Sequence, residues 1–358
     1  MADVAPFRAV RYAHSTPAVV APPYDVISAA ERGELAERDP HNIVHLTLND
    51  SEEEAGRLFR AWLGDGTLVR YEEPAVWALA QDYVGPDGVA RTRHGVVASL
   101  RAEPYEARVV LPHERTHAGP KESRLRLLRA ARAQIEPIFL LYDGLPPVSP
   151  PDREPDLDVE GTRLWRVEDA GEVTEFFSGR QLLIADGHHR YETALAYAAE
   201  AGTPESARLV AVLVSTADPG LEIFPTHRVF SGRPDVEPGG EEWGTPEEAL
   251  ERLEAEPYDN SVSLAYSRGA ARLVRGEAGE LDVELVDRFG HDGISYTPDW
   301  REAVRRVDEG EAEIAFLLRP TRIEDVFERA RRGEVMPPKT TYFFPKLLSG
   351  LLFHSLEP

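Results

Sequence analysis

A continuous apolar run, followed by a polar turn and a helical pattern, is the feature that most constrains the fold of this chain. The run Leu182-Leu183-Ile184-Ala185 has the length of a buried strand. After the turn at residues 186–190, apolar residues recur at helical spacing over 191–198 and share one helical face. The sequence therefore predicts a strand, a tight turn and a helix, as in an α/β fold.

The turn between this strand and this helix carries most of the chemistry. Its residues are Asp186, Gly187, His188, His189 and Arg190. A helix amino terminus presents unpaired backbone N–H groups and the positive end of the helix dipole, and a glycine lets the backbone approach a ligand. The histidine and arginine side chains add donors at the same end, so the turn predicts a phosphate site. The alternative is that Asp186 only caps the helix and the histidines are ordinary polar residues of a turn.

Other patterns extend the α/β interpretation along the chain. Alternation predicts a hairpin over residues 75–102, and apolar runs predict strands over 41–48 and 138–142. Strands over 208–216 and 221–230 are expected to pair through a turn at 218–220. Helical spacing predicts helices over 52–63 and 121–133.

An acidic stretch rich in glycine and proline, residues 231–245, is the best candidate for a domain boundary. We expect an α/β core with mixed sheets over residues 1–230 and a smaller α+β subdomain over 231–330. Residues 331–358 are expected to form a tail that packs back on the core.

The charge and composition exclude several classes of protein. The 63 acidic and 40 basic residues give a net charge of -23, which opposes binding to nucleic acid or to an anionic membrane. The chain has no cysteine, so disulfides, thiolate metal sites and a cysteine nucleophile are absent. No apolar run is long enough to span a membrane, and we expect a cytoplasmic protein.

A basic region over residues 113–132 runs against the overall charge. It holds six Lys or Arg and two Glu, a local net charge of +4. Here Lys121 and Arg124 could deliver charge to a phosphate, and Glu114 could act as a base or hold a magnesium ion. The segment His113-Glu114-Arg115-Thr116-His117 also matches the H-E-x-x-H zinc motif, but that motif needs a helix, and Pro112 and Pro120 flank it closely. A solvated basic helix face is the third interpretation.

Three further residues are candidate contributors. Asp25 follows a rigid Pro-Pro-Tyr turn that would project its carboxylate from the end of a strand. Arg228 is expected in a strand next to the 186–190 turn. Lys339 is one of only three lysines, with Lys121 and Lys346, in a chain where arginine supplies almost every basic residue. A compact ammonium in such a chain suits a point-charge contact with a ligand.

The whole chain resembles the bacterial and archaeal family known as domain of unknown function 1015. The run from Ile184 to Leu195 is similar to the hallmark of that family. The other matching blocks, in order, are APPYDVIS, HNIVHL, LPHERT, PKESRL, EPIFLLYD, PTHRVF, AFLLRPT and MPPKTTYFFPKLLSGL. The turn also resembles, over a short stretch, the phosphate-binding element of the ParB/sulfiredoxin superfamily. It differs from the Asp-Gly-His-Thr-Arg of archaeal free-serine kinases only at His189.

This resemblance implies a ParB/sulfiredoxin-like nucleotide-binding core and transfer of a phosphoryl group from ATP, with Mg²⁺, to a small hydroxyl compound such as free serine. Residues 186–190 would hold the phosphates, with Lys339 as a further ligand. Lys121 and Arg228 would neutralise developing charge, and Asp25 or Glu114 would take the hydroxyl proton.

Two alternatives stay open. The first is a nucleotide-binding regulator that binds ATP or CTP without catalysis, and the second is an H-E-x-x-H metal-dependent hydrolase. A small-molecule partner and a homodimer are compatible with every interpretation. DNA partitioning fits poorly, because the sequence shows no basic helix-turn-helix pattern.

Overall fold

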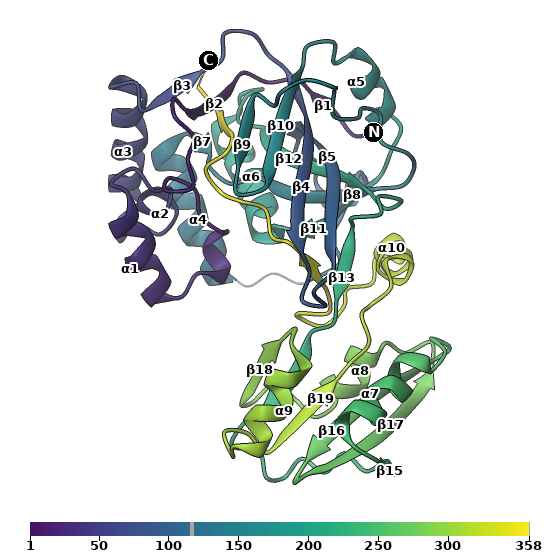
Figure 1. Cartoon of the computed structure of the whole chain (residues 1–358). Helices are drawn as coiled ribbons and strands as arrows, with labels where there is room; N and C mark the ends of the chain where they lie inside the picture. Colours follow the sequence, from purple (N-terminus) through teal and green to yellow (C-terminus); the bar gives the residue numbers. More distant parts are fainter. Residues whose placement is uncertain (115–117, 358) are drawn as a thin grey trace. The chain divides into compact units, whose positions relative to one another are not determined.

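The computed structural model describes residues 1–114 and 118–357, and these residues form two compact units (Figure 1). Unit 1 comprises Met1–Gly85, Ala90–Leu221 and Pro345–Pro358. Unit 2 comprises Pro86–Val89 and Glu222–Phe344. The domain boundaries expected after residues 230 and 330 stay a prediction.

A mixed sheet, nine-stranded among the described residues, lies at the centre of unit 1. Its order is β6-β11-β8-β12-β5-β4-β10-β9, with β1 paired to β5. The pairs β6/β11 and β8/β12 are parallel and the others are antiparallel. Their bounds are β1 Val4–Ala5, β4 Val76–Val84, β5 Ala90–Arg101, β6 Val110–Leu111, β8 Ile138–Tyr142, β9 Leu157–Val159, β10 Thr162–Val167, β11 Leu182–Asp186 and β12 Arg208–Ser215. The predicted α/β class with mixed sheets is confirmed.

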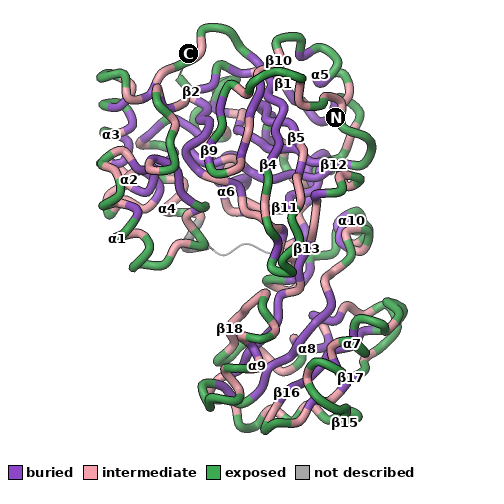
Figure 2. Tube along the Cα trace, viewed as in Figure 1, coloured by how far each residue is buried: buried purple, intermediate pink, exposed green. Residues whose placement is uncertain are grey.

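Two helices, α5 (Gly171–Phe177) and α6 (His188–Ala201), pack on one face of this sheet. Phe177 and Tyr191 from the helices join Leu140 and Ile184 from the strands in one apolar cluster, and all four are fully buried. Figure 2 shows the central strands as the most continuously buried part of unit 1. This packing fixes the start of α6 against the end of β11.

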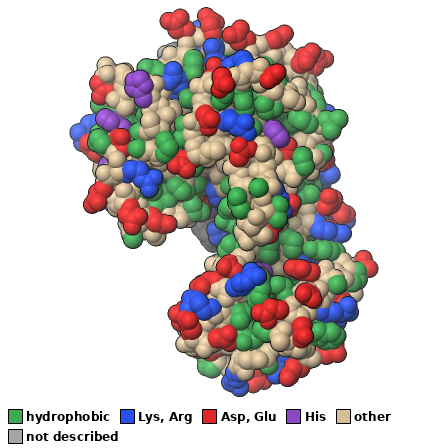
Figure 3. Space-filling view, in the orientation of Figure 1, with side chains coloured by type: hydrophobic (Ala, Val, Ile, Leu, Met, Phe, Trp, Pro, Cys, Tyr) green, Lys and Arg blue, Asp and Glu red, His purple; other side chains and the backbone are tan. Residues whose placement is uncertain are grey.

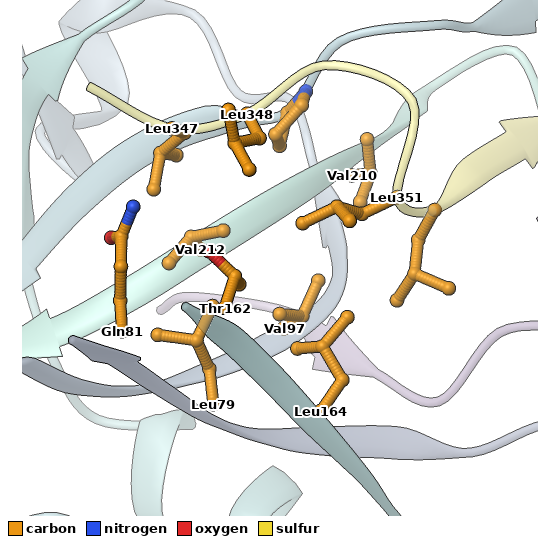
Figure 4. A pocket seen from close by; sticks show the side chains of 12 residues that line it. Leu79, Gln81, Val97, Thr162, Leu164, Val210, Val212, Leu347, Leu348 and Leu351 are labelled. Atoms are coloured by element: carbon orange, nitrogen blue, oxygen red, sulfur yellow. The ribbon is translucent and has the colours of Figure 1, made fainter. Parts of the chain in front are cut away.

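The carboxyl-terminal segment of unit 1 covers the opposite face of the sheet. Leu347, Leu348 and Leu351 lie over side chains of β4, β5, β10 and β12 (Figure 4). They enclose a cavity of about 20 Å³ whose lining is almost entirely apolar. Thr162 lines this cavity and is 2% exposed, and its hydroxyl has no hydrogen-bond partner among the described residues.

Replacing Thr162 by valine is therefore expected to raise the free energy of unfolding by about 1 kcal/mol, because a buried hydroxyl without a partner loses its hydration on folding. Thr47→Val is the matched control. Thr47 is equally buried, but its hydroxyl donates to the carbonyl of Ile43 at 3.3 Å, so valine there should destabilise. Urea unfolding of both variants measures the difference, and a loss of stability in Thr162→Val would contradict the assignment.

The rest of unit 1 is a group of helices and a second sheet of order β3-β2-β21-β7. The strands are β2 Ala9–Tyr12, β3 Leu68–Arg70, β7 Ala133–Gln134 and β21 Phe353–Ser355. The helices are α1 Ala29–Arg38, α2 Val44–Thr47, α3 Glu52–Gly64 and α4 Ala118–Ala131, with short 3-10 turns η1 Tyr24–Val26 and η2 Tyr105–Ala107. The predicted hairpin over 75–102 and helices over 52–63 and 121–133 are confirmed as β4–β5, α3 and α4.

The strand predicted over residues 41–48 is wrong, because this stretch contains the helix α2. The fully buried Asn42 donates from Nδ2 to the carbonyl of Ala18 at 2.6 Å and accepts from the backbone N–H of Val44 at 3.0 Å. These bonds close a turn at the start of α2. A short apolar run is compatible with either period, and here the side chain of Asn42 decides in favour of the helix.

The predicted pairing of residues 208–216 with 221–230 is also wrong. Strand β12 pairs instead with β5 and β8 of the large sheet. The segment after it forms two strands of unit 2, β13 (Glu222–Phe224) and β14 (His227–Phe230), which pair with other strands of that unit. The polar turn at 218–220 therefore does not close a hairpin.

Unit 2 is built on a sheet of order β15-β17-β16-β19-β14-β18 and a two-stranded sheet β13-β20. Apolar clusters lie on both faces of the larger sheet. The remaining strands are β15 Glu241–Trp243, β16 Asn260–Ser267, β17 Ala270–Ala278, β18 Ile294–Thr297, β19 Ile314–Leu317 and β20 Tyr342–Phe344. The helices are α7 Pro246–Ala255, α8 Asp282–Asp287, α9 Trp300–Asp308 and α10 Ile323–Arg332.

Candidate functional site

The turn between β11 and α6 has the conformation that only glycine adopts easily. Gly187 has φ 97° and ψ 28°, in the left-handed region. A Cβ at this position would lie 2.9 Å from Cγ2 of Ile138 and 3.2 Å from Nε of Arg190. Helix α6 begins directly after it, so the N-cap residue is a glycine, which has no side chain to cap the first turn. The backbone N–H groups of that turn are therefore oriented as an anion site requires.

Asp186 lies between two cations at this turn. Its Oδ2 accepts from Nη2 of Arg190 at 2.5 Å, and its Oδ1 accepts from Nζ of Lys346. Burial alone would raise the pKa of this carboxyl, but Lys346 and Arg190 outweigh burial and hold the pKa well below its ordinary value. Asp186 is therefore ionised. Its two oxygens are bonded to cations, and the predicted phosphate ligand Arg190 is one of them.

The guanidinium of Arg190 lies close to several other charged groups of unit 1. Its guanidinium donates to the carbonyl of Pro137 as well as to Asp186. Burial lowers its pKa, but Asp186, then Glu136 and Asp25, reverse that effect and leave the pKa raised. Glu136 accepts from the backbone N–H of Tyr24 at 3.2 Å. Residues from η1, the segment before β8 and α6 thus surround one guanidinium.

The helix α4 and the carboxyl-terminal segment contribute to the same cluster. Arg124 of α4 lies over the ring of Tyr24, with Cζ 4.2 Å from the ring centroid, and its Nη1 is 3.9 Å from Oε2 of Glu136. Ser349 donates its hydroxyl to Oε1 of Glu136 at 2.9 Å. The fully buried Arg93 of β5 lies close enough to Asp186 for their charges to interact. We call Arg93, Arg124, Glu136, Asp186, Arg190 and Lys346 the charged cluster.

Two histidines pack beside the start of α6. The rings of His113 and His188 meet edge to face with centroids 4.7 Å apart. Nε2 of His188 accepts from the backbone N–H of His113 at 3.3 Å, and Nδ1 of His113 donates to the carbonyl of Ile184 at 2.6 Å. Burial lowers the pKa of His113 to about 4 and that of His188 well below its ordinary value. Both rings are therefore neutral at neutral pH.

The lowered pKa of His113 predicts a loss of stability in mild acid. Above pH 6.5 this group is neutral in both states; as the pH falls from 6.5 to about 4, the unfolded chain binds the proton and the folded chain does not. This loss amounts to roughly 3 kcal/mol at most, and it stops below pH 4. His113→Asn should flatten the curve of unfolding free energy against pH in that window. The exposed His14→Asn is the control, and an unchanged curve for His113→Asn would contradict the prediction.

The other predicted site residues of unit 1 differ in their contacts and in their exposure. Nζ of Lys121 is 2.5 Å from Oε2 of Glu192, so this lysine already has a carboxylate on α6. Asp25 is exposed on η1, while Glu114 and His189 are half-buried. Glu114 and His113 lie outside helix α4, and residues 115–117 of the zinc motif lie outside the described residues. Among the residues that the structure describes, no group of three or more His, Asp or Glu side chains could hold a metal ion.

The predicted ligands Arg228 and Lys339 belong to unit 2. Arg228 is 1% exposed and donates to the carbonyl of Thr226 at 2.9 Å, and burial lowers its pKa to about 10. Lys339 is exposed and has a positive φ of 59°. Their role in nucleotide binding stays a prediction.

The family model described as a protein of unknown function, DUF1015, matches residues 4–269. The chain belongs to this family. The resemblance predicted from the sequence blocks is thus confirmed for the family, whose description assigns no activity. The chain matches no curated protein.

Solved structures of three proteins are similar to this DUF1015 chain. A free serine kinase in complex with AMP has 18% identity and a TM-score of 0.40, covering 66% of this chain and 83% of that one. A conserved hypothetical protein from Pyrococcus furiosus has 18% identity and a TM-score of 0.36, covering 70% and 93%. SbnI from Staphylococcus aureus, with a carboxyl-terminal truncation, has 12% identity and a TM-score of 0.40, covering 71% and 85%. These scores are too low to assign the ParB/sulfiredoxin-like core, which stays a prediction.

Sequence reasoning missed several members of the charged cluster in this DUF1015 protein. Lys346 is one of only three lysines, but nothing in the sequence joins it to Asp186, 160 positions away. Glu136 lies in the EPIFLLYD block, where a charged residue two positions before a buried strand is the available signal. Arg93 sits within a hairpin strand and is fully buried, which alternation alone does not reveal.

Proposed function

We propose that the Gly187 turn and the charged cluster bind the phosphates of a nucleotide, and that the protein transfers a phosphoryl group from ATP to a small hydroxyl compound. One observation carries this proposal. Among the described residues, the charged cluster holds four cations and two carboxylates, a surplus of two positive charges that falls to one when the exposed Asp25 near Arg190 is counted, beside an uncapped helix amino terminus.

A surplus of buried positive charge is costly unless an anion completes it. Phosphate oxygens suit this place, because guanidinium, ammonium and backbone N–H groups all donate charge-assisted hydrogen bonds to them. The chain as a whole repels anions, with a net charge of -23, and acidic side chains are spread over the face seen in Figure 3. Capture of a phosphate therefore depends on this local cluster.

The positions of Asp25, Glu114 and Lys121 suit them to the remaining roles in phosphoryl transfer. Asp25 is exposed and its charge acts on Arg190, so it can take the proton of an acceptor hydroxyl, as can the half-buried Glu114. Lys121 would neutralise developing charge after leaving Glu192. Magnesium fits this chemistry, since Mg²⁺ usually takes one or two carboxylates and draws its other ligands from phosphates and water. Asp25 would hold the Mg²⁺ ion, because both oxygens of Asp186 are bonded to cations, and Glu114 would then take the proton. The ion would neutralise phosphate charge.

Product formation tests this proposal. Purified protein is incubated with Mg²⁺-ATP and a panel of hydroxyl amino acids, and phosphorus NMR detects a phosphorylated product, while calorimetry measures ATP binding. Binding with a phosphorylated product is the expected result. Binding without any product would support the alternative, a regulator that binds nucleotide without catalysis. Absence of binding would overturn both.

A further inference from the structure

A small cavity in unit 1 lies between α4, β7 and the first turns of α6. Its volume is about 30 Å³. Five polar residues line it, and the rest of its lining comes from leucine, alanine and isoleucine side chains; the polar residues are Arg124, Gln134, Glu136, Arg190 and Thr193. We call it the Glu136 cavity.

Glu136 offers an oxygen that has no hydrogen bond among the described residues. The residue is 7% exposed, and both donors that reach it, Ser349 Oγ and the backbone N–H of Tyr24, bond to Oε1. The nearest cation to Oε2 in the described part of the chain is Nη1 of Arg124, at 3.9 Å, which is beyond hydrogen-bond distance. In a residue that is only 7% exposed, a carboxylate oxygen without a donor is costly, so this oxygen is suited to a donor from a ligand.

Donors lie on the same lining as this acceptor. The side chain of Arg124 is 13% exposed and carries five N–H groups, of which one bonds to the carbonyl of Thr47 at 2.8 Å and one to Ser123 Oγ at 3.5 Å. Gln134 is 7% exposed, and its amide nitrogen Nε2 is buried with no hydrogen-bond partner among the described residues. The Glu136 cavity thus places an unused acceptor beside unused donors.

We propose that the Glu136 cavity binds the head group of a small 2-hydroxy or 2-amino carboxylate. The carboxylate accepts hydrogen bonds from Arg124 and from Nε2 of Gln134, and the adjacent hydroxyl or ammonium donates to Oε2 of Glu136. One water needs about 10–15 Å³, so the cavity holds about two water-sized groups, enough for one carboxylate oxygen and the hydroxyl or ammonium, and the rest of the ligand would extend beyond it. Arg190 lines both the cavity and the Gly187 turn, so a ligand here lies beside the phosphate site. That the ligand of this cavity is the phosphoryl acceptor rests on the proposed function.

Binding of small probes to the full-length protein, without nucleotide, tests this assignment. Glycolate carries both groups, acetate only the carboxylate and ethanol only the hydroxyl. Ligand-observed NMR titration is expected to give glycolate an affinity at least about tenfold above that of acetate, with no saturable binding of ethanol, since one good hydrogen bond to a charged group contributes about 1.5–3 kcal/mol. Equal affinities for glycolate and acetate would overturn the proposal.

Variants locate the site. Arg124→Met and Glu136→Gln should each weaken glycolate binding about tenfold or more. Gln134→Leu, which keeps the shape and all charges, should weaken it less but measurably. Arg129→Met is the control, since Arg129 is on the same helix but pairs with Glu200 at the surface. If Arg124→Met and Gln134→Leu bind glycolate as tightly as the wild type, the cavity is not the binding site. This conclusion holds even when Glu136→Gln fails to fold.

The same proteins separate this inference from the proposed function. If the wild type binds glycolate but no ATP, the phosphotransferase proposal fails and the cavity assignment stands. If it binds ATP but glycolate binding is absent or insensitive to Gln134→Leu, the cavity assignment fails and the nucleotide site stands.

Discussion

Replacing Arg190 by methionine is expected to weaken ATP binding by at least about a hundredfold, equivalent to about 2.8 kcal/mol. Arg190 is 9% exposed, and its guanidinium bonds to Asp186 and to the carbonyl of Pro137. Without Arg190 the charged cluster loses one of its four cations, and Asp186 keeps Lys346 as its one bonded cation among the residues that the structure describes. Isothermal titration calorimetry with ATP measures the change.

Arg129→Met is the matched control for this variant. It removes an arginine that joins α4 to α6, but at an exposed ion pair with Glu200, so ATP affinity should be unchanged. Hydrogen exchange of peptides covering β11 and α6 reports whether Arg190→Met still folds around the turn. Wild-type affinity for ATP in a folded Arg190→Met protein would remove the Gly187 turn as the phosphate site.

The local part of this site could be predicted from the sequence. A strand over 182–185, a glycine turn and a helix after it all depend on neighbouring residues, and the structure has them as β11, Gly187 and α6. The helix begins at His188, inside the turn predicted over 186–190. The left-handed φ of Gly187 follows from the need to turn sharply between a buried strand and a helix packed on the same sheet.

The non-local part could not be predicted. Contacts such as Lys346 with Asp186 and Ser349 with Glu136 depend on how the carboxyl-terminal segment crosses the sheet. No periodicity encodes that path. The strand wrongly predicted over 41–48 failed for a related reason: the side chain of Asn42 bonds to the carbonyl of Ala18, 24 positions away, and so favours a helix there.

A second large effect is expected in unit 2, where Arg319 and Asp282 form a buried ion pair. Nε and Nη2 of Arg319 bond to the two oxygens of Asp282 at 2.8 and 2.7 Å. The other three N–H groups bond to the carbonyls of Glu256, Pro257 and Asn260, so all five donors are used. Arg319→Met is expected to destabilise unit 2 by about 3–5 kcal/mol, because it leaves the Asp282 carboxylate buried without its cation.

Hydrogen exchange of peptides covering β16 and β19 measures this loss within unit 2, with peptides of β5 and β12 as an internal reference in unit 1. Arg322→Met is the control. Arg322 also lies over the ring of Tyr258, but its pair with Asp325 is exposed, so a loss of no more than about 1 kcal/mol is expected. The double variant Arg319→Met with Asp282→Leu should recover much of the stability, because it removes the stranded charge. Equal losses in Arg319→Met and Arg322→Met would show that ring contact, and not the buried charge, stabilises this part of unit 2.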